Sequence, residues 1–391
     1  MFANWFHPAA AIPKPRRAMA LVLCSLAVLA TDVAGTAAHA DEIAGATMEP
    51  GSAVGSHGFS GGWGGIESAR FIEYITEGPT GAPTMATGVL ATPDGTPPAG
   101  GWPIVAWEHG TSGLGATCGI STNPRYDAPI VRRLLDQGYA VVAPDYVGLG
   151  AVAATTHPYL QSRTEATATV DLVRAARHVN AALARRWAVT GVSQGGHAAL
   201  NTGGIADIYA PELEFRGTAA LAPPSNIEGV LALAGPYVPE VPGFEGSTAL
   251  FAAMLNGMRL AAPDTVAAAL TPAGADALAR IDRRCQREWQ SAVRGTTIGS
   301  MLQRPVAGSP LADALTGYLR VPTSGYRGPL FIAHGTADNV VPIALTRLLL
   351  TQYTLAGTKY EFRSYDTDHE GIVAAAWPDV LSFVAAVLGP A

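Results

Sequence analysis

The stretch RWAVTGVSQGGHAAL, residues 186–200, decides the fold. The apolar run over residues 187–192 is typical of a buried strand, and the small apolar residues 198–200 favour a helix. Between them lies Gly191-Val192-Ser193-Gln194-Gly195. Glycines two residues either side of a serine relieve the crowding of a sharp strand-to-helix turn, which lifts the hydroxyl above the sheet. We therefore predict a nucleophile elbow with Ser193 at its tip.

Two later segments supply partners for this serine. They are FIAHGTAD, residues 331–338, and SYDTDH, residues 364–369. Each follows a strand-like run, and together they give the chain order Ser, Asp, His of the α/β-hydrolase fold. A serine hydroxyl needs a base, for which we predict His369, and an acid that orients the imidazole, for which we predict Asp338.

Other residues compete for these two roles. Asp366 and Asp368 are alternative acids, but they precede His369 on the same loop, where a sequence neighbour rarely points at Nδ1. The other candidate bases fit worse, because they lie at a strand end, in a helix, just after the serine or beside the acid: His109, His178, His197 and His334. A zinc helix built on His369-Glu370 would need a second histidine at position 373, which is Val. We expect neither a metal nor a cofactor.

Strand and helix patterns alternate over most of the chain, which predicts a mostly parallel central sheet flanked by helices. Strands are expected at 68–76, 83–91, 102–107, 139–144, 187–192, 215–222, 329–334 and 360–365, the first two antiparallel. Helices are expected at 128–136, 165–179, 343–355 and 373–388. The alternation breaks over residues 223–327, so we predict a core of residues 66–222 and 328–391 with a helical cap inserted between the nucleophile and acid strands.

The turn EHGTSG, residues 108–113, follows the strand at 102–107. The α/β-hydrolase fold places one oxyanion-hole amide in such a turn and the other on the residue after the nucleophile. We therefore predict that backbone amides near His109 and Gly110, and at Gln194, form an oxyanion hole.

The cap has helix-like runs at 247–260 and 272–293. The first is apolar around more than one stripe, so Met254, Leu255 and Met258 are candidates to line an acyl pocket. The alternative is that these side chains pack the cap on the core.

The N-terminus has the pattern of a secretory signal peptide. Lys14, Arg16 and Arg17 precede an apolar run over 18–30, and Ala38-His39-Ala40 offers a cleavage site after Ala40. The run is too short to span a bilayer, so we expect a secreted or periplasmic protein without a stable membrane anchor, Cys24 as a lipidation site being the alternative. Residues 41–65 lack any period, and we expect a flexible arm.

Composition narrows the partners. The formal net charge of −6 becomes −8 once residues 1–40, which carry +2, are removed, so nucleic acid is an improbable partner. Cys118 and Cys285 are then the remaining cysteines, and an even pair in an exported protein predicts a disulfide. We expect a monomer acting on a small-molecule or lipid ester.

Several ordered motifs resemble bacterial members of the secretory lipase family, to which fungal lipase A enzymes also belong. They are WEHGT (107–111), DYVGLG (145–150), HPYL (157–160), GVSQGGH (191–197) and the segment 334–342. The resemblance runs from about residue 67 to the C-terminus. It implies an α/β-hydrolase core with a helical cap, hydrolysis of carboxylic esters without a cofactor, Ser193, Asp338 and His369 as the triad, and amides near His109 and at Gln194 as the oxyanion hole.

Three hypotheses follow. The first is a secreted serine esterase or lipase that forms an acyl-enzyme, and the second is the same fold acting as a peptidase, a feruloyl-type esterase or a polyester hydrolase. The third is a non-catalytic binding module, which would be expected to have lost Ser193 or His369. Epoxide hydrolases and dehalogenases are excluded, because they carry Asp in place of the serine.

Overall fold

The computed structural model describes residues 49–239 and 245–389. Its strands form one sheet in the order β1-β2-β3-β5-β4-β6-β7-β8-β9. Their bounds are β1 Ala53–Gly58, β2 Arg70–Glu77, β3 Pro83–Ala91, β4 Trp102–Glu108, β5 Ala140–Pro144, β6 Leu183–Val192, β7 Glu214–Leu221, β8 Leu330–Gly335 and β9 Glu361–Tyr365. Each neighbouring pair among β1, β2, β3 and β5 is antiparallel, and β5, β4, β6, β7, β8 and β9 are parallel to one another. The predicted mostly parallel sheet is confirmed.

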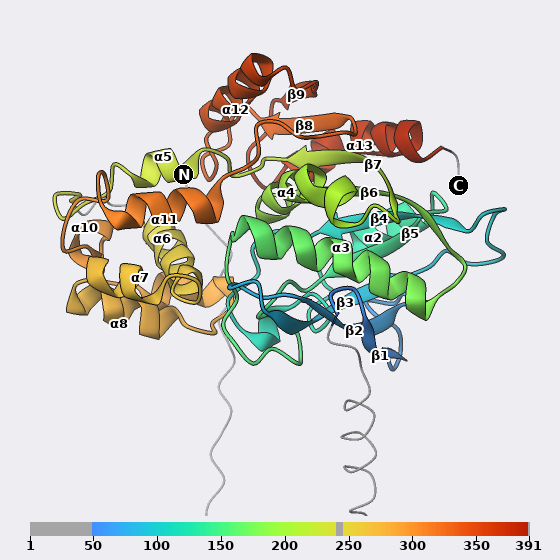
Figure 1. Cartoon of the computed structure of the whole chain (residues 1–391), viewed down its shortest axis with the longest axis horizontal. Coiled ribbons are helices and arrows are strands. Elements are labelled where there is room, and N and C mark those ends of the chain that lie inside the picture. The colour runs from blue at the N-terminus through green and yellow to red at the C-terminus, as the bar shows by residue number, and fades with distance from the viewer. Residues whose placement is uncertain (1–48, 240–244, 390–391) are drawn as a thin grey trace, which may run out of the picture. The chain divides into compact units, whose positions relative to one another are not determined.

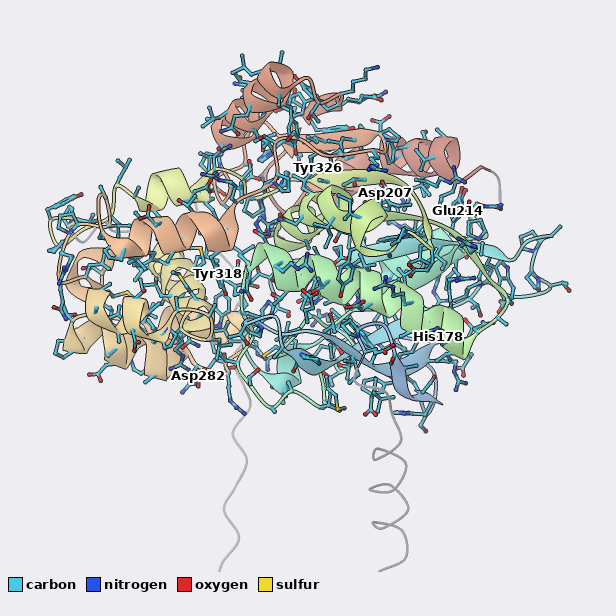
Figure 2. All side chains as sticks on the ribbon, in the orientation of Figure 1. His178, Asp207, Glu214, Asp282, Tyr318 and Tyr326 are labelled. Carbon is cyan, nitrogen blue, oxygen red and sulfur yellow. A yellow bond between two sulfur atoms is a disulfide. The ribbon has the colours of Figure 1, made fainter. Side chains whose placement is uncertain are left out.

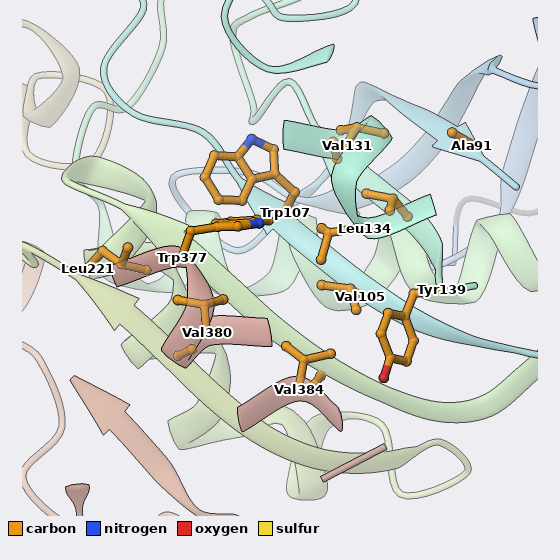
Figure 3. Close-up of a cluster of buried hydrophobic side chains, with 14 of the residues drawn as sticks. Ala91, Val105, Trp107, Val131, Leu134, Tyr139, Leu221, Trp377, Val380 and Val384 are labelled. Carbon is orange, nitrogen blue, oxygen red and sulfur yellow. The ribbon is translucent and has the colours of Figure 1, made fainter. Parts of the chain in front are cut away.

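Helices cover both faces of this sheet. Residues Ile104 and Ala106 of β4 pack with α3 (Ser162–Val179) and α4 (Gln194–Tyr209), which lie side by side in Figure 1. Val105 and Trp107 point the other way, toward α2 (Ala128–Leu135) and α13 (Ile372–Leu388), as Figure 3 shows. This alternation follows from the two-residue period of a strand, and burial on both faces explains why β4 reads as a continuous apolar run.

The remaining core helix, α12, spans Ile343–Ala356 between β8 and β9. Its residues Leu349, Leu350 and Tyr353 pack on Leu330 and Ile332 of β8. A short 3₁₀ turn over Ala116–Cys118 lies in the loop after β4. All of these elements place the carboxyl ends of the parallel strands along one edge, where α/β sheets bind ligands.

The segment between β7 and β8 is helical and has its own hydrophobic cluster. We call residues 223–327 the cap. Its helices are α5 Ile227–Leu231, α6 Glu245–Met258, α7 Pro263–Ala269, α8 Pro272–Ile281, α9 Trp289–Ala292, α10 Ile298–Met301 and α11 Pro310–Leu319. Helix α6 packs closely on its neighbours: a Cβ on Gly257 would lie only 2.8 Å from the hydroxyl of Tyr318 on α11 (Figure 2), so there is no room for a side chain at this position.

Two predictions about these elements were wrong. The arm expected over residues 41–65 is not without structure, since β1 pairs antiparallel with β2 as the edge strand of the sheet. The helix expected over 272–293 is broken: α8 ends at Ile281, and Asp282 (Figure 2) and Arg283, with a φ of 55°, turn the chain before α9. The predicted signal peptide, residues 1–40, and residues 41–48 of the arm lie outside the described residues.

The break after α8 has a physical reason in the way the cap joins the core. Cys285 forms the predicted disulfide with Cys118. Beside it the chain makes a short antiparallel bridge, in which the Leu114 amide donates to the Arg284 carbonyl and the Gln286 amide to the Ser112 carbonyl, both at 2.9 Å. Residues held extended against the loop after β4 cannot remain in a helix.

Candidate active site

Ser193 lies between β6 and α4 with a φ of 55° and a ψ of −121°. A residue other than glycine adopts such backbone angles at a cost of about 1–3 kcal/mol. The neighbouring glycines have no room for a side chain, because a Cβ on Gly195 would overlap the Glu108 carbonyl and one on Gly191 the Glu108 side chain. The sharp turn therefore depends on both glycines, as the sequence pattern indicates.

The predicted base and acid come to this turn from the ends of two other strands. His369 follows β9, and its Nε2 lies 3.0 Å from the Oγ of Ser193. Its Nδ1 lies 2.6 Å from Oδ2 of Asp338, which follows β8. A neutral imidazole with its proton on Nδ1 donates to the carboxylate and accepts from the serine, so the arrangement can move a proton from Ser193 to His369.

The carboxyl group of Asp338 is held on several sides. Its Oδ1 accepts from the amides of Val340 at 2.9 Å and Val341 at 2.8 Å, and His334 Nε2 lies 3.3 Å from Oδ2. Burial opposes ionisation, but the hydrogen bonds from His334, His369 and the Val341 amide outweigh it, so the pKa of Asp338 lies well below its usual value. Asp338 is therefore ionised at neutral pH.

The competing acids lie elsewhere on the histidine loop. Asp368 is exposed, and its Oδ1 accepts from the amide of Gly371 at 2.9 Å, just before α13. Asp366 is exposed as well. His334, a poorer candidate base by its place beside the acid, also accepts from the Thr346 hydroxyl at 2.9 Å and donates to the Val341 carbonyl at 2.8 Å.

The predicted oxyanion residues border the serine. A Cβ on Gly110 would lie 3.9 Å from the Cβ of Ser193. Among residues 49–239 and 245–389, neither the Gly110 amide nor the Gln194 amide donates to another protein group. The imidazole of His109 is engaged by other groups, with Nδ1 2.6 Å from the Gly110 carbonyl and its ring packed on Tyr146. Two unused N–H groups beside Ser193 are available for an oxygen that acquires negative charge.

A buried polar cluster under the elbow escaped the sequence reasoning. Glu165 accepts from Gln194 at 2.9 Å and from His197 at 2.6 Å, and Gln194 also donates to His157 at 2.7 Å. Burial lowers the pKa of His157 to about 3, so this ring is neutral and accepts that bond. The available signal was a glutamate on the buried face of the helix at 165–179, but nothing local pairs it with a residue 29 positions later.

Glu108, at the end of β4, is a second buried carboxyl under the elbow. Burial raises the pKa of Glu108 to about 8, against the hydrogen bond of 2.6 Å that it accepts from Thr169. This group is therefore protonated at neutral pH, which avoids a second buried negative charge near Glu165.

The residues proposed for an acyl pocket are buried in the cap. Leu255 is fully enclosed, Met258 is 1% exposed and Met254 is 7% exposed. All three belong to the same hydrophobic cluster as Tyr159 and Trp289. This burial fits the packing alternative for Leu255 and Met258.

Neither a metal-binding cluster nor a membrane-spanning helix occurs in the part of the chain that the structure describes. It holds no group of three or more His, Cys, Asp or Glu residues that could bind a metal ion. None of its helices has both the length and the apolar character needed to cross a membrane.

A serine on a strand-to-helix turn, with a histidine and an aspartate from two later strands of a mostly parallel sheet, defines an α/β-hydrolase. The chain belongs to the secretory lipase family, whose model matches residues 118–386. The resemblance found in the sequence motifs is thus confirmed.

Solved structures share the fold. The rice cell wall degrading esterase LipA from Xanthomonas oryzae superposes with a TM-score of 0.68 at 22% identity, over 87% of this chain and 97% of that one. Candida antarctica lipase A gives a TM-score of 0.68 at 21% identity, over 86% and 82%. A poly(3-hydroxyoctanoate) depolymerase from Pseudomonas fluorescens is 32% identical over 119 residues, which are 28% of this chain and 42% of the depolymerase.

Proposed function

We propose that this protein is a secreted serine hydrolase that cleaves carboxylic esters through an acyl-enzyme. The observation that carries the proposal is the hydrogen-bonded chain from Asp338 through His369 to Ser193, with distances of 2.6 and 3.0 Å. Membership of the secretory lipase family supports the ester as the substrate. The disulfide supports an oxidising compartment, as expected after export.

The reaction follows from the positions of these groups. Ser193 Oγ attacks the ester carbonyl while its proton passes to Nε2 of His369, and Asp338 stabilises the imidazolium. The carbonyl oxygen becomes negative and accepts from the amides of Gly110 and Gln194. The C–O bond to the alcohol then breaks as His369 returns the proton to the leaving oxygen. Water, activated by the same histidine, attacks the acyl-enzyme and releases the acid.

We further propose that the cap roofs this site. The support is its attachment to the loop that carries Gly110, through the disulfide and the bridge beside it. Thr111 on that loop bonds to Tyr159 at 2.8 Å, and the Tyr159 ring packs edge-on against Trp289 of the cap. Part of the cap would then contact the acyl chain, with Met254 the candidate among the three predicted residues.

A second candidate substrate is an aliphatic polyester. The depolymerase from Pseudomonas fluorescens acts by its name on poly(3-hydroxyoctanoate), and the 32% identity to it favours this possibility. Polyester hydrolysis would use the same steps, because each repeat is linked by a carboxylic ester.

The test is a panel of p-nitrophenyl esters of rising chain length, beside a p-nitroanilide and a suspension of poly(3-hydroxyoctanoate). We expect turnover of esters but not of the anilide. Ser193→Ala should abolish turnover while the melting temperature stays at or above that of the wild type. A variant that kept more than about a tenth of the wild-type kcat would exclude Ser193 as the nucleophile.

A further inference from the structure

The polar cluster under the elbow joins three parts of the molecule. Glu165 belongs to the first turn of α3, Gln194 and His197 to the first turn of α4, and Leu319 ends α11 of the cap. His197 Nδ1 lies 2.6 Å from Glu165, and its Nε2 lies 2.8 Å from the Leu319 carbonyl. Glu165, Gln194 and His197 are all fully buried.

The hydrogen-bond requirements determine the charges in this cluster. Nδ1 of His197 faces a Glu165 oxygen and Nε2 faces the nearer Leu319 carbonyl, with the Asn201 side-chain nitrogen farther away at 3.3 Å; a ring that donates to both oxygens carries two protons. Burial opposes that charge, but the Glu165 carboxylate raises the pKa of His197 above its usual value. One oxygen of Glu165 thus faces the cationic ring of His197, and the other accepts from the side-chain NH₂ group of Gln194.

Gln194 has two different functions in this arrangement. Its backbone N–H is a proposed oxyanion donor, and its side chain is held between Glu165 at 2.9 Å and His157 at 2.7 Å. His157 is fixed in turn by donating from Nδ1 to the Val147 carbonyl at 2.7 Å. Because its side chain is held by these two bonds, Gln194 cannot rotate freely at the start of α4.

We propose that Glu165 is a positioning residue, which acts through the side chain of Gln194 to hold the Gln194 backbone amide in the orientation that an oxyanion requires. The inference rests on the proposed ester hydrolysis. His197 supports Glu165 by neutralising it, and its bond to Leu319 joins the end of the cap to the same cluster. Glu165 itself touches neither the substrate nor the reacting atoms.

The test uses the near-isosteric variants Gln194→Met and Glu165→Leu, and the conservative Glu165→Gln. Removing an oxyanion donor costs about 10²–10³-fold in kcat, so misaligning one should cost about 10- to 100-fold with little change in KM. Glu165→Gln should retain most of the activity, because Gln can still accept from Gln194 while its amide donates to a neutral His197.

A second readout separates positioning from general loss of structure. Sulfur accepts hydrogen bonds weakly, so a thionoester gains little from the oxyanion amides. The ratio of ester to thionoester turnover should therefore be lower in Gln194→Met and in Glu165→Leu than in the wild type. Asp171→Leu is the matched control, since Asp171 is an equally buried carboxyl on α3 that accepts from Thr76 and Tyr209 instead. It should lower the melting temperature and leave the ratio unchanged.

The outcomes are distinct. A wild type without ester turnover would defeat the proposed function, whereas an active wild type with an inactive Ser193→Ala would leave it standing. In that second case, a folded Gln194→Met with the wild-type kcat and ratio would overturn the positioning role alone. If Glu165→Leu fails to fold, Gln194→Met still decides the matter, and a ratio that narrows equally in Asp171→Leu would count against the inference.

Discussion

Replacing Asp338 by Asn is the sharpest test of the proposed acid. The amide oxygen of Asn keeps the bonds from Val340 and Val341, so its NH₂ group takes the place of Oδ2, 2.6 Å from His369 Nδ1. An NH₂ group donates, which forces Nδ1 to accept and moves the ring proton to Nε2. That nitrogen then faces Ser193 as a donor at 3.0 Å and cannot take the serine proton.

The size of the loss follows from this wrong tautomer and from the lost charge on Asp338. We expect kcat to fall by about 10⁴-fold, equivalent to about 5 kcal/mol of barrier, with KM little changed because Asp338 does not touch the substrate. The measurement is steady-state hydrolysis of a p-nitrophenyl ester, with thermal melting as the check on folding. Asp368→Asn is the control, since that exposed residue accepts from the Gly371 amide near the start of α13. A larger loss in Asp368→Asn than in Asp338→Asn would refute the reasoning.

Three further predictions concern stability and specificity. The Cys118→Ser/Cys285→Ser variant opens a loop of 167 residues and should lose about 5 kcal/mol of unfolding free energy in urea titrations, while an unchanged midpoint would mean that the disulfide contributes nothing. Glu108 keeps its proton in the folded state up to a pKa of about 8 but loses it near 4.5 when unfolded, so the free energy of unfolding falls as pH rises from 4.5 to 8. Glu108→Gln should therefore reduce the fall in melting temperature between pH 5 and pH 8. Parallel plots of melting temperature against pH for the variant and the wild type would contradict the raised pKa of Glu108. If Met254 contacts the acyl chain, kcat/KM should rise up to about fourfold per carbon until the pocket is full, and Met254→Trp should shorten the preferred ester; flat profiles for both proteins would place specificity elsewhere.

Most of the core could be predicted because its signals are local. Continuous apolar runs marked the buried parallel strands, and the glycines around Ser193 marked the turn. Strand β1 was missed because it is an edge strand of small and polar residues, half-buried or exposed, whose pairing with β2 uses backbone groups that any sequence possesses. The break after α8 was missed because it depends on a partner segment 167 residues away, joined through Cys285.

The site was predictable to a similar degree. Ser193, Asp338 and His369 each follow the end of a strand within a few residues, so chain order indicates that they converge at one edge of the sheet. The cluster around Glu165 carries no such mark. His197 was considered only as a poorer candidate base, yet both of its nitrogens are bonded, because burying an imidazole requires partners that the fold supplies from α3 and from the cap.

The backbone at Ser193 has a consequence for engineering this protein toward heat resistance. Its left-handed φ of 55° stores strain that only glycine would relieve, and glycine has no hydroxyl. A search for stabilising substitutions would therefore score the proposed nucleophile as one of the worst residues in the chain. Selection for thermal tolerance without a screen for turnover would favour replacing this serine, so the two selections must be applied together.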